Sequence, residues 1–498
     1  MNSPAIAAMT HDRQRAIDAL PSAAAFIDGQ WVPAGGLHHT HVDPSTGAEL
    51  GTWVLPDSAD VDRAVDSARR AQSEWWRAGP AARRDCLSAI ASEITSEAEA
   101  LASLVTLEMG MPAKASYAGV LAAAEWFRHY AGYADKLEGT VPAVGDPSRA
   151  LDYTRYVPFG VVAAIIPWNG PVMALALKVA PALAAGNAVV LKPSEIAPFS
   201  SLHFAMLATR AGLPAGVLNV VPGGPDVGAH LCAHPDVHLI SFTGGDRGGT
   251  AVSQAAAGRH IPTILELGGK SASLVFADAD VDKTAKLAAI LGIAQNSGQG
   301  CFLPTRLLVQ RSIYERTLDG VVAAANNIRI GDPFDRQTTM GPVVDARARD
   351  RILELIASAA ERGDGRLVHG GERIGGSLEN GNFVAPTVFA DVDPASPLGQ
   401  DEVFGPVLSV IPFDDEADAV QIANGTRYGL AGYVWTTDLG RAHRVAELMD
   451  AGSVSVNGMA LLPPAAPFGG WKASGHGVEG SRAGLLEYLR IKNVHVQW

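Results

Sequence analysis

Cysteine is scarce in this sequence, and its scarcity limits the chemistry available to the chain. Only three cysteines occur among 498 residues, at positions 86, 232 and 301. They show no paired spacing, so we expect no disulfide framework and a reducing compartment. None of them stands with a second cysteine or a histidine at the spacing of zinc ligands. We therefore predict no metal site.

Positive charge and long apolar segments are also in short supply. Lysine and arginine number 39 against 52 aspartates and glutamates, and a net charge of −13 is poorly suited to binding nucleic acid. The most apolar stretch, 161–190, is interrupted by Pro167, Asn169 and Lys178, which is typical of a buried core and not of a membrane span. The first residues mix charges into short apolar runs, unlike a secretory signal. We expect a cytoplasmic protein with neither a nucleic-acid nor a membrane partner.

What the sequence does contain is an alternation of strand-like and helix-like segments. Strands separated by helices imply crossover connections and a parallel sheet, so we predict an α/β fold. The predicted strands of a first series span 160–166, 188–191, 217–221, 238–242 and 272–276, and its helices span 60–76, 81–108 and 200–211.

A second series begins after about residue 265 and predicts a second α/β domain. Its helices span 280–294, capped by Asp280, and 345–362, with a strand at 306–309 and an extended segment at 403–411. Two segments, 141–156 and 488–496, fit neither series. They mix apolar and polar residues in partial alternation, as strands do that face solvent or pair with a partner.

Cys301 is the candidate nucleophile. It ends the run Asn296-Ser297-Gly298-Gln299-Gly300-Cys301, whose glycines let the backbone turn tightly and approach a ligand. A thiolate can add to an aldehyde carbon, release hydride and leave a thioester that water cleaves. The alternative is a small buried side chain, which is the usual role of a free cysteine. For Cys86 and Cys232 we favour that structural role.

Two polar residues are candidates to assist the cysteine. Glu266 stands among apolar neighbours, which should raise its pKa and allow it to act as a base near neutral pH. Its alternative role is a structural carboxylate paired with Lys270. Asn169 lies in a loop stiffened by prolines, where its amide, with the Cys301 backbone N–H, could bind an oxyanion. Its alternative role is to form a turn.

Three segments could bind a dinucleotide. Lys192 and Glu195 follow a predicted strand and could contact ribose hydroxyls, and a carboxylate there favours NAD over NADP. The glycine-rich turn 242–249 could offer backbone N–H groups to a diphosphate, although it does not match G-x-G-x-x-G and could be an ordinary βα turn. Glu402 and Phe404 could meet the nicotinamide end from across a cleft.

These segments, taken in order, resemble the motifs of the aldehyde dehydrogenase superfamily. The matching runs are PWNGP at 167–171, LKPSE at 191–195, FTG at 242–244, ELGGK at 266–270, GQGC at 298–301, EVFGP at 402–406 and PFGG at 467–470. The early FIDGQWV and DPSTG are also similar to the start of that family. The resemblance extends from about residue 25 to residue 496.

The resemblance implies a division of the chain and a role for each motif. It implies a Rossmann-like cofactor domain at 1–135 and 158–265, an α/β catalytic domain at 266–460, and a small β oligomerisation arm at 136–157 and 477–498. The arm implies a homodimer or homotetramer. Cys301 would be the nucleophile, Glu266 the base and Asn169 the oxyanion donor. NAD, with NADP as an alternative, would be bound by Ile165, Pro167, Trp168, Lys192, Ser194, Glu195, Gly224, Phe242, Thr243, Gly244, Gly245, Leu267, Glu402 and Phe404.

The sequence departs from the family pattern in three places. After FTG the family commonly has Ser-Thr-Glu, whereas this chain has Gly245-Asp246-Arg247, so a hydroxyl near the diphosphate is replaced by an acidic residue. Phe302-Leu303-Pro304 is larger and more apolar than usual after the cysteine. Val478 stands where an arginine is common, which bears on subunit contacts.

The substrate is expected to be a hydrophobic aldehyde. The positions that match the family's aldehyde tunnel carry small or apolar side chains and no cation, so a second carboxylate on the substrate would lack a partner. An aromatic, terpenoid or medium-chain aldehyde fits this lining, although the same residues could simply pack a core. Two other functions stay open, a coenzyme A-acylating enzyme and an inactive structural homologue. The predicted lining is Gly170, Ala174, Leu177, Phe302, Leu461, Leu462 and Phe468.

Overall fold

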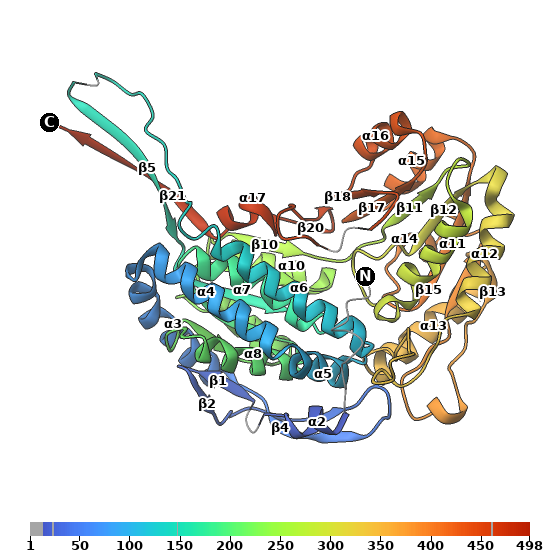
Figure 1. Cartoon of the computed structure of the whole chain (residues 1–498), viewed down its shortest axis with the longest axis horizontal. Helices are drawn as coiled ribbons and strands as arrows, with labels where there is room; N and C mark the ends of the chain where they lie inside the picture. The colour runs from blue at the N-terminus through green and yellow to red at the C-terminus, as the bar shows by residue number, and fades with distance from the viewer. Residues whose placement is uncertain (1–12, 22–23, 147, 460–461) are drawn as a thin grey trace.

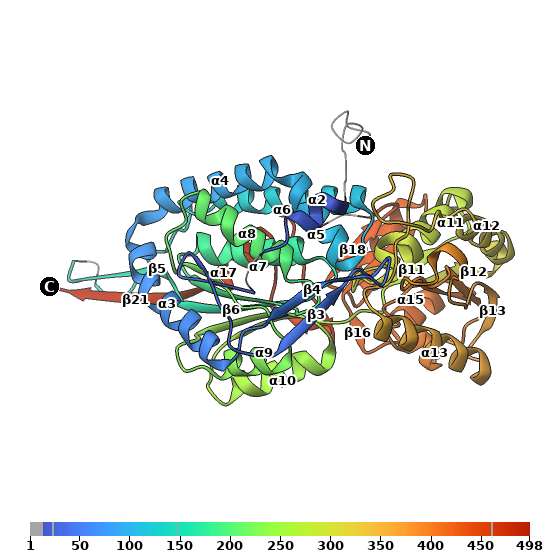
Figure 2. The same ribbon diagram turned by 90° about the horizontal axis from the view of Figure 1, so that it is seen from below.

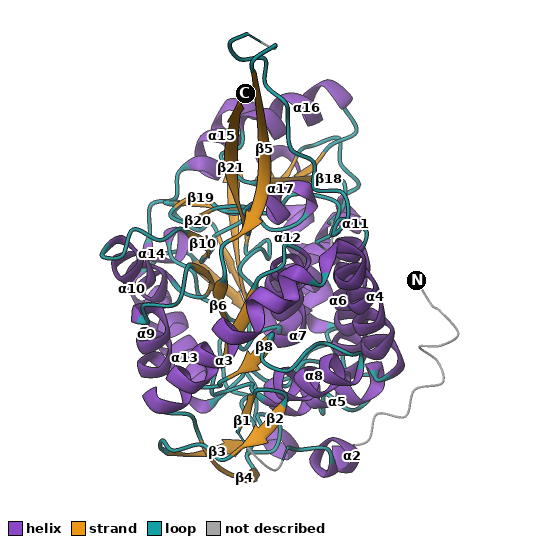
Figure 3. Cartoon of the chain, turned by 90° about the vertical axis from the view of Figure 1, so that its left-hand side faces the viewer, coloured by secondary structure: helices purple, strands orange, loops and turns teal. Residues whose placement is uncertain are grey.

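The chain forms two lobes, each built around its own sheet (Figure 1). The computed structural model describes residues 13–21, 24–146, 148–459 and 462–498. An eight-stranded sheet organises the first lobe and a seven-stranded sheet the second. Figure 3 shows strands in a central column with helices on both sides. The predicted α/β class is therefore confirmed.

The first sheet has the order β2-β1-β8-β7-β6-β9-β10-β20, and β8, β7, β6, β9 and β10 run parallel. Its strands are β1 (Ala25–Ile27), β2 (Gln30–Val32), β6 (Val161–Ile166), β7 (Ala188–Pro193), β8 (Leu218–Val220), β9 (Leu239–Thr243), β10 (Thr263–Glu266) and β20 (Gly475–His476). Alternate residues of β6 enter different cores: Val162 and Ala164 belong to one, and Val161 and Ala163 to the other. Both faces are covered, so these strands are apolar throughout and not alternating.

Helices cover the two faces of this sheet (Figure 2). One face carries α4 (Gly79–Ser96), α5 (Ala98–Met109), α6 (Ala113–Ala131), α7 (Pro171–Ala184) and α8 (Phe199–Arg210). The other carries α3 (Ser58–Arg77), α9 (Pro225–Ala233) and α10 (Asp246–Ala257). The prediction of one helix over 81–108 is wrong, because the chain breaks at Glu97 between α4 and α5.

The second sheet has the order β13-β14-β15-β12-β11-β17-β18, parallel except for β13. Its strands are β11 (Ala272–Val275), β12 (Arg306–Gln310), β13 (Arg366–His369), β14 (Thr387–Ala390), β15 (Val407–Phe413), β17 (Ala431–Trp435) and β18 (Ser453–Val456). Its helices are α11 (Val281–Ala289), α12 (Tyr314–Asn326), α13 (Ala346–Arg362), α14 (Pro397–Gln400), α15 (Glu416–Asn424) and α16 (Leu439–Leu448). Asp280 caps α11 by accepting from the Lys283 N–H at 3.1 Å, as predicted.

A long two-stranded antiparallel ribbon projects from the first lobe (Figure 1). It consists of β5 (Ala150–Pro158) and β21 (Leu489–Gln497), which pair antiparallel along their full length. Ile491 and Val496 lie exposed on β21, and Trp498 is exposed just beyond it. Exposed apolar side chains on a pair of strands are typical of a surface that binds another chain. The role of these two strands in joining subunits stays a prediction. The predicted domain bounds also stay a prediction.

A few short elements complete the described chain. None of its helices is long and apolar enough to cross a membrane. No group of three or more His, Cys, Asp or Glu side chains among the described residues is arranged to hold a metal ion. The remaining elements are α2 (Arg13–Asp18), β3 (His38–Val42), β4 (Glu49–Val54), β16 (Tyr428–Gly429), β19 (Trp471–Lys472) and α17 (Ser481–Leu486).

Candidate active site

Cys301 follows a helix that unwinds. The prediction of an α-helix over 280–294 is wrong at its end, because α11 stops at Ala289 and a π-helical turn occupies 290–294. Asn296 and Ser297 then take positive φ angles of 50° and 52°. Gly298 follows with φ of 73°, and a Cβ there would collide with the carbonyl oxygen of Gly405. The glycine therefore allows the cysteine loop to touch the EVFGP segment.

Asn169 is tied to this cysteine loop. Its side-chain Nδ2 donates to the carbonyl oxygen of Gln299 at 2.9 Å. In return, Asn296 Nδ2 donates at 2.8 Å to the carbonyl oxygens of both Asn169 and Gln299. Within the described chain, the second N–H of the Asn169 amide has no hydrogen bond. The loop after β6 and the loop before Cys301 are thus held together, as an oxyanion donor requires.

Cys301 is half-buried. Burial raises the pKa of its thiol, and the nearby carboxylates of Glu402 and Glu266 raise it further. The backbone N–H groups of Cys301 and Phe302 act in the opposite direction. A thiol in this environment is protonated at neutral pH, so its reaction requires a base.

Glu266 ends β10 and is 2% exposed. Neither carboxylate oxygen accepts a well-formed hydrogen bond among the described residues, although the backbone N–H of Gly470 lies close enough to lower its pKa. Burial raises its pKa well above the ordinary value, the charge of Glu479 adds to the increase, and Lys178 opposes it. A buried carboxylate with a raised pKa and no well-formed hydrogen bond is suited to act as a general base.

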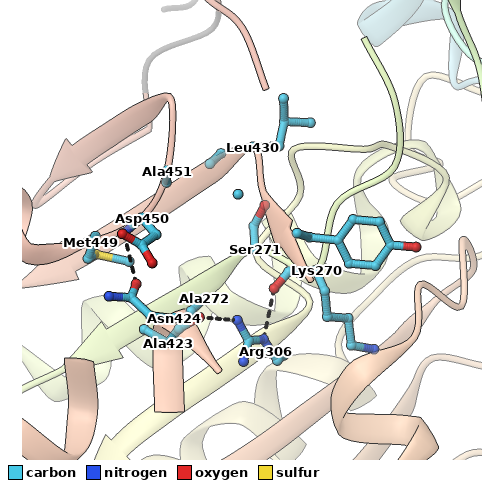
Figure 4. Close-up of a pocket in the computed structure, with 13 residues that line it drawn as sticks. Lys270, Ser271, Ala272, Arg306, Ala423, Asn424, Leu430, Met449, Asp450 and Ala451 are labelled. Carbon is cyan, nitrogen blue, oxygen red and sulfur yellow. Dashed lines mark hydrogen bonds between the residues drawn. The ribbon is translucent and has the colours of Figure 1, made fainter. Parts of the chain in front are cut away.

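Lys270 is not the partner of Glu266. It is fully buried near Glu402, and burial together with the Arg306 charge lowers its pKa to about 7. Arg306 fixes this segment by donating its Nε to the carbonyl oxygen of Lys270 at 2.8 Å, beside a small polar cavity (Figure 4). The paired structural role considered for Glu266 is therefore contradicted by the geometry.

The sequence analysis missed an ion pair next to Glu266. Lys178 Nζ on α7 lies 2.7 Å from Glu479 Oε1, and the two side chains are 0% and 1% exposed. Lys178 also donates to Ser241 Oγ at 3.1 Å. A lysine in the otherwise apolar α7 was a visible signal, because a buried charge requires a partner.

The adenosine side of the predicted cofactor site lies around the ends of β7 and β8. Lys192 is 7% exposed, and its pKa is lowered by burial. Glu195 accepts from Ser194 Oγ at 3.2 Å, and a Cβ on Gly224 would lie 3.8 Å from Glu195 Oε1. A charged pair beside a bare glycine backbone fits a ribose and its hydroxyls.

The predicted diphosphate site is the N-terminus of α10. Gly245 is its N-cap, with an extended backbone and no side chain capping the helix. A Cβ on Gly245 would meet nothing within 4 Å, so the first amides of the helix face open space. A Cβ on Gly244 or Gly248 would press on the Phe242 ring, at 2.5 and 2.8 Å. These glycines let α10 pack on Phe242 while leaving its N-terminus accessible to an anion.

The second lobe closes the site from the other side. Glu402 Oε1 accepts from the Gly269 N–H at 3.1 Å. Burial raises the Glu402 pKa to about 7, and the Asp246 charge contributes. Phe404 adopts φ of 52° and meets Trp168 edge to face, with ring centroids 5.5 Å apart. The prediction that 403–411 is extended throughout is therefore wrong, since β15 begins only at 407.

The predicted cofactor residues come from both lobes. They lie in the loop after β6, at the ends of β7, β9 and β10, at the starts of α9 and α10, and in the loop before β15. Their places are Ile165, Pro167 and Trp168 around the end of β6; Lys192, Ser194 and Glu195 around the end of β7; Gly224 at the N-cap of α9; Phe242 and Thr243 at the end of β9; Gly244 and Gly245 between β9 and α10; Leu267 after β10; and Glu402 and Phe404 before β15.

Most of the predicted substrate residues adjoin an apolar region. Ala174, Leu177 and Leu462 pack in the same hydrophobic cluster as Trp168. Phe302 and Phe468 meet edge to face with centroids 6.3 Å apart. Gly170 is the N-cap of α7, and Leu461 lies outside the described residues. Met173, Leu121 and Trp126 also belong to this cluster.

Comparisons with known proteins show which family the chain is similar to. The model of the aldehyde dehydrogenase family matches residues 31–494. A betaine aldehyde dehydrogenase of Agrobacterium fabrum is 40% identical over 484 residues, which cover 96% of this chain and 97% of that protein.

Two solved structures extend the comparison. An indole-3-acetaldehyde dehydrogenase complexed with NAD+ is 39% identical, with a TM-score of 0.94 over 98% of this chain and 100% of that one. A betaine aldehyde dehydrogenase of Staphylococcus aureus, also with NAD+, is 35% identical, with a TM-score of 0.94 over 97% of both chains. The fold, the ordered motifs and these relatives lead to one conclusion: the chain belongs to the aldehyde dehydrogenase family.

Proposed function

We propose that this enzyme uses NAD to oxidise a hydrophobic aldehyde to its carboxylic acid through a thioester on Cys301. Two observations support the proposal: the Asn169 amide is tied to Gln299 in the loop before Cys301, and the charge of the buried Glu266 carboxylate acts on the Cys301 thiol. Two structural relatives that contain NAD+ support the choice of cofactor.

The first half of the reaction forms the thioester. A base removes the thiol proton, and the sulfur then bonds to the aldehyde carbon. The oxygen becomes an oxyanion held by the Asn169 amide and the Cys301 backbone N–H. NAD, when bound, accepts the hydride that leaves this carbon. Lys192 and Glu195 would hold its adenosine ribose, and Glu402 and Phe404 would position its nicotinamide half.

The second half of the reaction releases the acid. Glu266 takes a proton from water, and the hydroxide adds to the thioester carbon. The carbon–sulfur bond then breaks, which frees the carboxylic acid and restores the thiol. Water at this step makes the enzyme hydrolytic, and the presence of Glu266 favours water over coenzyme A as the acyl acceptor.

The substrate class is proposed from the tunnel lining. Ala174, Leu177 and Leu462 share one apolar cluster, and the predicted lining includes no lysine or arginine. A hydrophobic chain gains free energy by leaving water there, whereas a second carboxylate would be desolvated without a partner.

The test is a comparison of kcat/KM with NAD for octanal, benzaldehyde and succinic semialdehyde, each measured with and without coenzyme A. We expect NADH formation with the first two aldehydes at higher kcat/KM than with the semialdehyde, and none by Cys301→Ala. A preference for the semialdehyde would refute the substrate class. A requirement for coenzyme A would refute the hydrolytic route.

The ribbon formed by β5 and β21 is proposed to join subunits. Its exposed Ile491, Val496 and Trp498 support a homodimer or homotetramer. Light scattering measures the mass in solution, and a monomer at micromolar concentration would contradict the proposal.

A further inference from the structure

The most unusual residue near the proposed diphosphate site is Asp246. It is the first residue of α10, directly after the open Gly245 N-cap. It replaces the second residue of the Ser-Thr-Glu run that is common in the family. A carboxylate stabilises the N-terminus of a helix, but it repels a second anion bound at the same place. The chain therefore places negative charge where a doubly negative group is expected.

Asp246 is paired with the opposite lobe. Its Oδ2 accepts from the hydroxyl of Tyr428 at 2.8 Å and lies 3.0 Å from Arg427 Nη2. Arg427 Nη2 also donates to the Tyr428 hydroxyl at 2.6 Å, and its guanidinium lies 4.6 Å above the Tyr428 ring. Three contacts thus hold one guanidinium of the second lobe beside one carboxylate of the first lobe.

A second carboxylate crowds the same turn. A Cβ on Gly268 would lie 2.9 Å from Glu402 Oε2 and 3.1 Å from Asp246 Oδ1. Both carboxylates therefore border one glycine, and the charge of Asp246 raises the pKa of Glu402. Arg427 is the cation that pairs directly with Asp246. Without it, Asp246 would be an uncompensated negative group beside Glu402, whose own charge is offset by Lys270 and Arg351.

We propose that Arg427 determines cofactor affinity by neutralising Asp246, so that the N-terminus of α10 can accept the cofactor diphosphate. The proposal rests on the function above, since it assumes that the diphosphate lies at Gly245. Arg427 is a positioning residue in this scheme, because it acts through the carboxylate that it pairs with.

The two residues can be separated by a double-mutant cycle. Arg427→Met removes the charge but keeps an apolar stem over Tyr428. Asp246→Asn removes the charge but keeps an oxygen that can accept from the Tyr428 hydroxyl. The measured quantity is the Kd for NADH, from a fluorescence titration of the full-length enzyme.

We expect Arg427→Met to raise this Kd about tenfold, because it exposes Asp246 to the diphosphate. Asp246→Asn should leave the Kd unchanged or lower it. The double variant should return to within about twofold of wild type. The defect of Arg427→Met should shrink as ionic strength rises, since salt screens a repulsion between partly exposed charges.

Two further variants make the result decisive. Arg444→Met is the matched control, because Arg444 pairs with Glu416 at 3.0 Å on the second lobe, and its Kd should match wild type. Gly245→Val tests the placement itself, since a side chain there has free space in the protein and would meet only the cofactor.

An unchanged Kd in Arg427→Met would overturn the role of Arg427. A double variant that binds NADH as weakly as Arg427→Met would also overturn this role. It would show that the contact only holds the two lobes together. If Gly245→Val binds NADH normally, the assumed diphosphate site is wrong and the inference falls with it. If only Gly245→Val binds weakly, the proposed function stands and the inference alone fails.

Discussion

Two groups of charged residues lie near Cys301, and they differ in their access to water. The core cluster consists of Glu266, Lys178 and Glu479, which are 0–2% exposed. The cleft cluster consists of Glu402, Asp246 and Arg427, in which the Asp246 and Arg427 side chains are 30% and 55% exposed. Each contains two carboxylates and one cation, so burial is the main difference between them.

Burial changes what the same charges do. In the core cluster, water cannot screen an unpaired charge, so the lone Glu266 carboxylate acquires a raised pKa and Lys178 is bound to Glu479. In the cleft cluster, solvent reduces each interaction and leaves room for an anionic ligand to enter. The core cluster is thus suited to proton transfer and the cleft cluster to adjusting cofactor affinity.

Glu266→Gln is the most direct test of the difference between the two clusters. This change removes the base but retains the size of the side chain, so steady-state NADH formation should fall by about 10²–10⁴-fold. NADH binding should be unaffected, since the cleft cluster is intact. Stopped-flow absorbance and a fluorescence titration measure the two quantities. Activity within threefold of wild type would show that another group is the base.

The same variant should also change how the stability of the fold depends on pH. An acid whose folded pKa lies above its unfolded value of about 4.5 stabilises the fold below that pH, and this contribution is lost as pH rises. Glutamine does not ionise, so the Glu266→Gln variant does not lose this stability as pH rises. The Tm of Glu266→Gln should therefore exceed that of wild type by a margin that widens as pH rises above 4.5.

A second prediction compares the two cations. Lys178→Met leaves Glu479 buried and unpaired, so it should destabilise the fold by about 3–5 kcal/mol. Arg427→Met removes a cation that is half in solvent, so it should cost under about 1 kcal/mol. Thermal unfolding at one protein concentration compares the two variants.

The double variant Lys178→Met/Glu479→Leu is the control for this comparison. It should be more stable than Lys178→Met, because it removes the stranded charge. Equal losses in Lys178→Met and Arg427→Met would contradict the distinction between the clusters.

The alternation of elements was predictable from sequence because it reflects local physics. A strand covered on both faces, such as β6, must be apolar at every position, and an Asp before a helix, such as Asp280, marks its start. The candidate catalytic residues could be proposed because the motifs that contain them are short and ordered. These features depend on neighbours in the chain.

The missed features depend on distant residues. Lys178 and Glu479 are 301 positions apart, and Asp246 and Tyr428 are 182 apart, so no local pattern pairs them. The break at Glu97 has no proline or glycine to mark it. Arg210 on α8 forms ion pairs with both Glu93 and Glu97, which places tertiary contacts at the break.

The smallest predicted effect concerns the pH response of the cleft cluster. Burial and then the Asp246 charge bring the Glu402 pKa to about 7, so its carboxylate ionises as pH rises through that value. Only the ionised form is a full acceptor for ribose hydroxyls. The Kd for NADH should therefore fall about threefold between pH 6 and pH 8, and Glu402→Gln should flatten this change.

Two other variants assign the titration to Glu402. Asp246→Asn removes a charge that raises the Glu402 pKa, so the midpoint should move to lower pH. Lys270 also has a pKa of about 7 and faces Glu402, so it could produce an inflection in the same range. An inflection that persists in Glu402→Gln would belong to Lys270. In that case the cleft would respond to pH through a cation of the ELGGK segment, and the contrast between the clusters would rest on exposure alone.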